Sequence, residues 1–413
     1  MAMFKQLLLL FFSLCCAATN AQPLSTAQWK KDILTLQASV KQHHINPFHT
    51  ISEGAFDQHV SQLLNKVPDL NEAEIEVQIS HLLASLGDGH SNYNLMSGPH
   101  RHYPFNFQFF GEHLRVVAAA QPYQHLIGSE LVAINQIKVS ELQKKLKPYI
   151  SGVDNIYSFK VRFAFQITIA KLLFGSGVSR EQYTAKFTFK QNTMTSTHTV
   201  KAVTMHQFAQ ITSPFKRANP ALTWQPIKLD GIRFATLPAY DTVYIDFDHY
   251  PEPLSVITQC DAIQKTIRKS SANALIIDFR GNGGGNFYSG LALSSCLLPL
   301  DQFDWQNKIA VLIDHVTFSA AMSNAAQFKS LLNAQIIGTP SGGDPNHYSE
   351  THRLSLPHSH RRYSLSKRYY SFSSVSSDAL YPDKHLTQSW DEYQQGIDQP
   401  LLSTLSLFKN LQR

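Results

Sequence analysis

The chain has 413 residues, of which 43% are hydrophobic and 16% are charged. This length exceeds that of one ordinary hydrophobic core and fits two or three domains, and the apolar share excludes a disordered protein. Lys and Arg exceed Asp and Glu by 36 to 30, which gives a net charge of +6. Because no run of five like charges occurs, the composition does not predict a nucleic-acid-binding protein.

Residues 1–21 have the pattern of an export signal. Lys5 precedes an apolar stretch over 7–14, and small residues lead to Ala21, after which we expect cleavage. The apolar stretch is shorter than the roughly 20 residues of a membrane-spanning helix. Cys15 and Cys16 leave a lipid anchor as the less favoured alternative. The sequence therefore predicts an exported protein, periplasmic or extracellular, without stable membrane insertion and of unknown oligomeric state.

Residues 22–95 predict a helical domain. Capping-box patterns begin at Ser25 and Asn71, and apolar residues follow each at helical spacing. Gly87 is expected to end the second of these helices, which places His90 in the connector just after a helix end.

Residues 96–228 predict a β-rich middle region. Phenylalanines alternate over 105–109, and a Thr-rich alternating segment over 186–203 indicates a hairpin. A helix is expected over 139–146.

Residues 229–413 predict an α/β domain, in which strands and helices alternate. The segment 309–313 is continuously apolar, as is 274–279 apart from Asp278, and both indicate strands buried on both faces. Cys260 and Cys296 lie in this domain. They either pair as a disulfide in an oxidising compartment or lie buried as free thiols.

Two loops follow these buried strands. The first, over 281–285, contains three consecutive glycines but lacks a dinucleotide fingerprint, because Asn286 stands where the last glycine would be. The second leads into a helix of small residues that begins near Ser319. Such a serine either caps its helix or serves as a nucleophile beside an amide that can bind an oxyanion. Because parallel strands end at one edge of a sheet, we expect both loops to lie together.

These segments resemble the motifs of the S41 tail-specific peptidases, a family that includes the C-terminal processing proteases and tricorn. The glycine loop and the segment 317–321 are similar to the paired signatures of that family. Further similarities follow in the family's order at 83–91, 337–343, 381–383 and 396–401. The resemblance implies an α+β multidomain protein with a crotonase-like catalytic core, an N-terminal helical domain and a degenerate PDZ-like middle region.

The resemblance also implies site residues. Ser319 would be the nucleophile, with its oxyanion held by the N–H groups of Gly284 and Ala320. The processing proteases use a lysine base, but Lys329 lies inside the serine's own helix. We therefore favour the histidine base of the tricorn-like branch, which is His90 here.

The residue that orients this histidine is less defined. By order along the chain Asp378 is the first candidate and Glu350 the second.

The sequence predicts no metal and no cofactor. His358 and His360 form only a two-ligand fragment, which is expected in an exposed loop. The predicted partner is a peptide or protein substrate. The alternative is a noncatalytic protein that binds a hydrophobic ligand or a peptide on the same fold, as interphotoreceptor retinoid-binding proteins do. Met322 favours this alternative slightly, because many peptidases of the family have a glutamate there. A third option is an esterase that uses the same serine.

Overall fold

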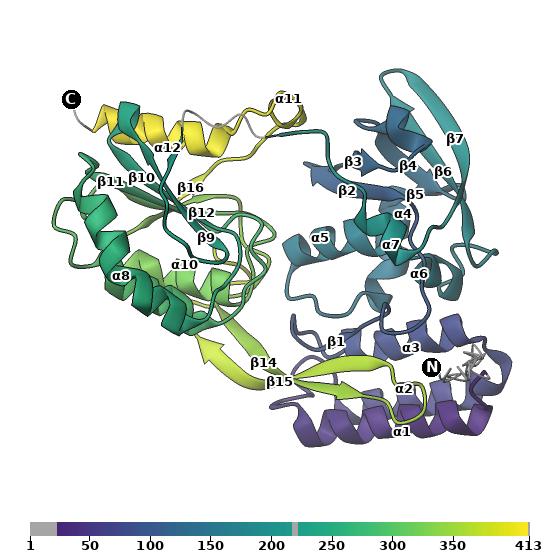
Figure 1. The fold of residues 1–413 in the computed structure, drawn as a ribbon. Coiled ribbons are helices and arrows are strands. Elements are labelled where there is room, and N and C mark those ends of the chain that lie inside the picture. The colour runs from purple at the N-terminus through teal and green to yellow at the C-terminus, as the bar shows by residue number, and fades with distance from the viewer. Residues whose placement is uncertain (1–22, 217–221, 412–413) are drawn as a thin grey trace, which may run out of the picture.

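The computed structural model describes residues 23–216 and 222–411. This part of the chain forms a mixed α and β structure with three sheets. Figure 1 shows two lobes, one built from the N-terminal half and one from the C-terminal half, joined below by a long hairpin. The predicted export signal over 1–21 lies outside the described residues.

Three helices begin the described chain: α1 (Thr26–His43), α2 (Glu53–Lys66) and α3 (Glu72–Ala84). Both predicted capping boxes are confirmed, with Ser25 and Gln28 at α1 and Asn71 and Glu74 at α3. Gly87 follows α3 with a φ of +69°, the left-handed conformation that stops a helix.

A six-stranded sheet occupies the middle region, in the order β2-β3-β4-β6-β7 with β5 on β4. Its strands are β2 (Phe105–Phe110), β3 (His113–Ala119), β4 (Glu130–Ile134), β5 (Ile137–Lys138), β6 (Thr184–Gln191) and β7 (Met194–Lys201). The hairpin expected over 186–203 is β6 and β7. The region is less purely β than predicted, because it also holds α4 (Val139–Leu146), α5 (Ile156–Gln166), α6 (Ala170–Gly175) and α7 (Met205–Ala209).

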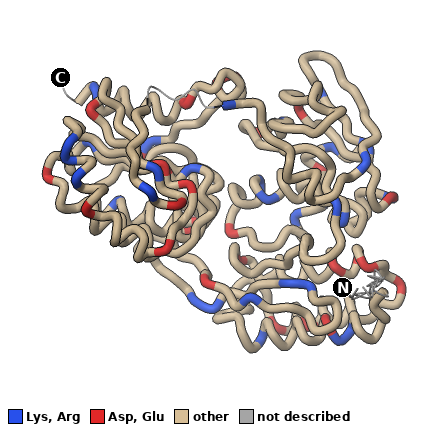
Figure 2. Tube along the Cα trace, viewed as in Figure 1, with Lys and Arg blue, Asp and Glu red and all other residues tan. Residues whose placement is uncertain are grey.

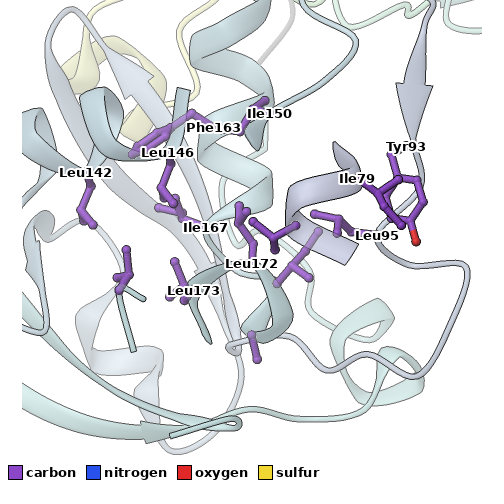
Figure 3. Packing of buried hydrophobic residues seen from close by; sticks show 14 of the residues in the cluster. Ile79, Tyr93, Leu95, Leu142, Leu146, Ile150, Phe163, Ile167, Leu172 and Leu173 are labelled. Atoms are coloured by element: carbon purple, nitrogen blue, oxygen red, sulfur yellow. The ribbon is translucent and has the colours of Figure 1, made fainter. Parts of the chain in front are cut away.

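One apolar core joins the N-terminal helices to this sheet. Buried side chains of α1–α3 and of the sheet form a single cluster with those of α4, α5 and α6. Figure 3 shows part of this cluster, with Ile79 of α3, Leu146 of α4, Phe163 of α5 and Leu172 of α6. Short 3-10 helices link the larger elements here and further on: η1 (Val67–Asp69), η2 (Tyr123–Leu126), η3 (Lys147–Tyr149) and η4 (Pro238–Tyr240).

A seven-stranded sheet forms the other lobe, in the order β16-β13-β12-β11-β10-β9-β8. The strands from β10 to β16 are parallel, and β9 and β8 complete the sheet in antiparallel pairs. They are β8 (Thr223–Trp224), β9 (Ile232–Leu237), β10 (Thr242–Phe247), β11 (Ala274–Asp278), β12 (Ile309–Ile313), β13 (Gln335–Gly338) and β16 (Lys384–His385). The two predicted buried strands are β11 and β12, and every residue of both is buried.

Helices cover both faces of this sheet. On one face pack α8 (Pro253–Arg268), α9 (Phe287–Leu297) and α10 (Ala320–Leu331), and on the other packs α12 (Gln399–Asn410). The short α11 (Trp390–Gln394) precedes α12. Cys260 of α8 and Cys296 of α9 form a disulfide, which decides between the two states that the sequence left open.

The hairpin β14 (Asn346–Ser355) and β15 (Arg362–Ser371) leaves the C-terminal lobe and crosses to the N-terminal one (Figure 1). There β15 pairs with β1 (Asn92–Tyr93) in a third sheet of three strands. Leu356, Tyr363 and Leu365 of the hairpin belong to the N-terminal core. The hairpin, a segment of the C-terminal half, is thus packed into the N-terminal half and ties the two together.

No described helix is both long and apolar enough to span a membrane. Figure 2 shows basic and acidic residues mixed over both lobes, in line with the small net charge.

Candidate active site

Ser319 lies in a strained turn between β12 and α10. Its backbone has a φ of +52° and a ψ of −126°, a conformation that non-glycine residues rarely adopt and that is typical of functional turns. Its hydroxyl makes no capping bond to the helix that follows. Instead Oγ lies 2.9 Å from Nε2 of His90, a residue 229 positions earlier in the chain. The helix-cap interpretation of Ser319 is therefore wrong.

The glycine loop after β11 packs against this turn. Gly284 has a φ of +99°, and a Cβ added to it would lie 2.7 Å from Cβ of Ser319 and 2.9 Å from the nitrogen of Ala320. Asn282 anchors the loop, since its side chain donates to the carbonyl of Phe247 at 2.6 Å. The two predicted loops thus lie side by side at the carboxyl edge of the parallel strands.

The two predicted oxyanion donors differ in availability. Within the described chain the N–H of Ala320, the first of α10, has no hydrogen-bond partner. The N–H of Gly284, in contrast, donates to Oδ1 of Asn282 at 2.8 Å and is not free to bind an oxyanion. Its neighbour Gly285 lines the cleft, and its N–H makes no bond to a described residue.

His90 is held by the connector after α3 and by the hairpin. Its N–H donates to Asp88 at 2.8 Å, and its carbonyl accepts the hydroxyl of Ser364 at 2.7 Å. Asn92 of β1, two residues further on, pairs with Ser364 of β15. The hairpin that starts in the lobe of Ser319 therefore fixes the histidine that faces it.

Aromatic rings and hydroxyls surround the imidazole. The ring of His90 stacks on Phe318 at 4.7 Å and on His347 of β14 at 5.7 Å between centroids. Ser349 of β14 is a second hydroxyl near Nε2, at 3.4 Å. Burial, and then the charges of His347 and Arg162, lower the pKa of His90 to about 4, although Asp88 acts in the opposite direction. The imidazole of His90 is therefore neutral at pH 7.

Neither predicted orienting residue reaches His90. Asp378 lies in an exposed loop, where its carboxylate accepts the hydroxyl of Tyr381 at 2.9 Å. Glu350 lies on β14 rather than in a loop and accepts the hydroxyl of Tyr370 at 2.7 Å. Nδ1 of His90 is buried without a side-chain partner among the described residues, and the backbone of Tyr348 acts on the ring instead, in the direction that raises its pKa. An acidic side chain on Nδ1 is thus absent from the described part of the site.

A second carboxyl lies under the histidine turn. Asp154, in the loop before α5, accepts the N–H of Gly89 through Oδ1, whereas its Oδ2 is buried and bonds to no residue that the structure describes. Burial and then the charge of Asp88 raise the pKa of Asp154 to about 7.

The cleft around Ser319 has a volume of about 630 Å³. Its walls come from α9, α10, the hairpin and the connector that holds His90. They include His90, Phe287, Tyr288, Ser323, Gln327, Arg353, Lys367, Tyr370 and Phe372. Lys329 lies elsewhere and pairs with Asp383, so it is not the base for Ser319. No cluster of His, Cys, Asp or Glu that could hold a metal occurs over 23–216 and 222–411.

Residues 241–370 match the family model described as Peptidase family S41. This match, within the C-terminal half of the chain, supports a serine-type peptidase. Among solved structures it is similar to mature CPAF in complex with lactacystin, with a TM-score of 0.66 and 12% identity over 94% of this chain and 98% of that one. Tricorn protease aligns with a TM-score of 0.46 and 13% identity over 94% of this chain and 37% of that one. No curated protein sequence matches the chain.

The hairpin is the part of the peptidase site that the sequence analysis missed. His347 and Ser349 of β14 face His90, and Ser364 of β15 holds it. A signal was present, because Tyr363 and Leu365 alternate with serines as in a half-buried strand. The partner of that strand, β1, has only two residues and is too short to recognise from sequence.

Proposed function

We propose that this peptidase cleaves peptide bonds through an acyl-enzyme on Ser319, with His90 as general base. The observation that carries the proposal is the 2.9 Å contact between Ser319 Oγ and His90 Nε2, made by a serine whose strained turn leaves its hydroxyl free of the helix. A nucleophile in hydrogen-bond reach of a neutral imidazole is the arrangement that serine catalysis requires.

The reaction then follows from these groups. His90 Nε2 takes the proton of Ser319 Oγ while Oγ attacks the carbonyl carbon of the substrate. The N–H of Ala320 binds the oxyanion, and we assign the second donor to Gly285 rather than Gly284, whose N–H already serves Asn282. The C–N bond breaks as His90 returns its proton to the leaving amine. A water molecule, deprotonated by His90, hydrolyses the ester and restores Ser319.

Labelling with a fluorophosphonate tests this proposal, because only an activated serine reacts. Wild type should be labelled at Ser319, and Ser319→Ala should lose both labelling and peptide cleavage while its unfolding temperature stays nearly unchanged. Ser330→Ala, on the same helix and outside the cleft, should behave as wild type. Ser349→Ala should still be labelled. If Ser349→Ala loses labelling and Ser319→Ala keeps it, Ser349 is the nucleophile instead.

A protein that only binds a hydrophobic ligand or a peptide in this cleft is the competing function, favoured by the aromatic side chains of Phe287, Tyr370 and Phe372. Such a protein would not react with the fluorophosphonate at any pH. Comparison of ester and peptide substrates separates a peptidase from an esterase.

We further propose that the peptidase is exported to the periplasm or the cell exterior, with cleavage after Ala21. The disulfide between Cys260 and Cys296 supports an oxidising compartment, because such bonds rarely persist in the cytosol. Mass spectrometry of the mature N-terminus tests the cleavage site. An intact Met1 in a cytosolic fraction would contradict it.

For the architecture, we propose that the seven-stranded lobe is a crotonase-like core and that the six-stranded sheet is a degenerate PDZ-like module. The helices on both faces of a mainly parallel sheet support the first assignment. Calorimetric titration with peptides that end in a free carboxylate tests whether the module binds peptide tails.

A further inference from the structure

Asp88 belongs to the histidine turn itself and lies two residues before His90. Its Oδ1 accepts the N–H of His90 at 2.8 Å, the N–H of Ser91 at 2.6 Å and the hydroxyl of Ser366 at 2.7 Å. Its Oδ2 lies 2.7 Å from Nε2 of His44. The residue is only 3% exposed, so these groups replace its hydration.

The hydrogen bonds of His44 show which atom carries the proton that lies between His44 and Asp88. Nδ1 of His44 accepts the N–H of Asn46 at 3.0 Å. That nitrogen carries no proton, so Nε2 carries one and donates it to Asp88. Burial alone would raise the pKa of Asp88, but the hydrogen bonds from His44, Ser91 and Ser366 outweigh burial and hold the pKa well below its ordinary value. Asp88 is therefore a buried negative charge at every pH at which the peptidase works.

This charge acts on the imidazole of His90. It favours the protonated ring, against burial and the positive groups around it. Besides Asp88, His347 on β14 and Arg162 on α5 act on the charge of the ring. Glu350 on β14 and Lys367 on β15 line the same cleft, and Asp154 before α5 accepts the N–H of Gly89 under the turn. Asp154 is largely neutral at pH values well below 7, where the acid limb of His90 lies, and Glu350 is paired with Lys367 at 3.6 Å. Asp88 is thus the acidic group that stabilises the imidazolium formed when Ser319 loses its proton.

We propose that Asp88 is the positioning residue of His90, in the role that the sequence analysis gave to Asp378. It acts through the backbone of the turn, whose N–H groups it holds, and through its charge. Ser366 also bonds this carboxylate to β15, so the hairpin, the carboxylate and the base form one connected unit. The inference rests on the proposed function, since it assumes that His90 is the base.

The test is the pH dependence of the rate at which a fluorophosphonate labels Ser319. In Asp88→Asn the loss of charge lowers the pKa of His90 further, so the acid limb of the profile should move to lower pH. The plateau should fall by about 10²-fold, because the turn loosens and the imidazolium loses its counter-charge. If the plateau rate falls but the acid limb stays at the same pH, Asp88 acts only on the structure of the turn, and the proposal is overturned.

Asp32→Asn is the matched control. Asp32 is also a fully buried carboxylate that accepts two N–H groups, those of His358 and Ser359 in the turn of the same hairpin, at 2.9 and 2.8 Å. It has no contact with His90, so its variant should unfold more easily without moving the acid limb. A shift in this control equal to that of Asp88→Asn would also overturn the proposal.

A second variant covers the case in which Asp88→Asn does not fold. Ser366→Ala removes one donor from Asp88 and leaves its charge, so the plateau rate should fall roughly threefold to tenfold with the affinity for the probe unchanged. An unchanged rate in folded Ser366→Ala would overturn the proposal. Failure of the proposed function looks different, because wild type itself would then not be labelled at Ser319.

Discussion

Replacement of Gly284 by alanine tests the geometry of the site most directly. The new Cβ would lie 2.7 Å from Cβ of Ser319, 2.8 Å from the carbonyl oxygen of Phe318 and 2.9 Å from the nitrogen of Ala320. Two of these three atoms belong to the backbone, so no side-chain rotation relieves the overlap. The backbone of Gly284 also has a φ of +99°, which alanine adopts only with strain.

Both effects have a magnitude. The positive φ costs about 1–2 kcal/mol, and the overlap costs about 1–3 kcal/mol if the turn gives way. The free energy of unfolding should therefore fall by about 2–5 kcal/mol. Because the atoms that must move belong to the proposed nucleophile and oxyanion donor, the rate of fluorophosphonate labelling should fall by about 10²-fold in protein that is still folded.

Two neighbouring glycines separate these contributions. A Cβ on Gly283 would meet nothing within 4 Å at an ordinary φ, so Gly283→Ala should match wild type in stability and rate. Gly281 has a φ of +80° and the same open surroundings, so its alanine variant should lose stability but keep its labelling rate. Denaturant unfolding and labelling kinetics on the three variants give both quantities. If Gly284→Ala labels as fast as Gly283→Ala, the packing of the loop against Ser319 is not what the structure describes.

Three further predictions concern stability. Asp154 has a raised pKa of about 7 in the folded chain, so the stability that its neutral form contributes is present below its ordinary pKa and is lost as the pH rises through 7. Asp154→Asn cannot lose a proton there. Between pH 4 and 8 its free energy of unfolding should therefore rise relative to that of wild type, by at most about 4 kcal/mol. The disulfide of Cys260 and Cys296 spans 36 positions, so its reduction should cost about 4 kcal/mol in denaturant unfolding. Arg280 donates to Asp398 at 2.7 and 2.8 Å with both side chains buried, so Arg280→Met should cost about 3–5 kcal/mol because it leaves a buried carboxylate unpaired.

Each of these has an outcome that contradicts it. A pH-independent difference between Asp154→Asn and wild type would mean that this carboxyl does not titrate near pH 7. An unfolding curve insensitive to reductant would exclude the disulfide in the mature protein. Arg233→Met is the control for Arg280, because its ion pair with Asp246 is exposed and should contribute less than about 1 kcal/mol. Equal losses in the two variants would refute the argument from burial.

Local patterns were enough to predict the nucleophile side of the site. A run of apolar residues over 309–313 identifies β12 without knowledge of its neighbours, and the run over 274–279 identifies β11 in the same way. Parallel strands end at one edge, so the glycine loop and Ser319 were expected together, and Gly284 does lie against Ser319. The capping boxes of α1 and α3 were equally predictable, because both partners lie within four residues.

The base side of the site depends on contacts between distant segments. The motif identified His90, but nothing near it in the sequence shows that Ser364 and Ser366 of a hairpin more than 270 residues away hold its turn. Order along the chain pointed to Asp378 as the orienting acid, but Asp378 accepts the hydroxyl of Tyr381 in an exposed loop, whereas Asp88, two residues before His90, accepts the N–H of His90. Patterns of polarity specify which face of an element is buried. Which strand meets which is decided by the packing of whole elements, and here that packing brings His90 to Ser319.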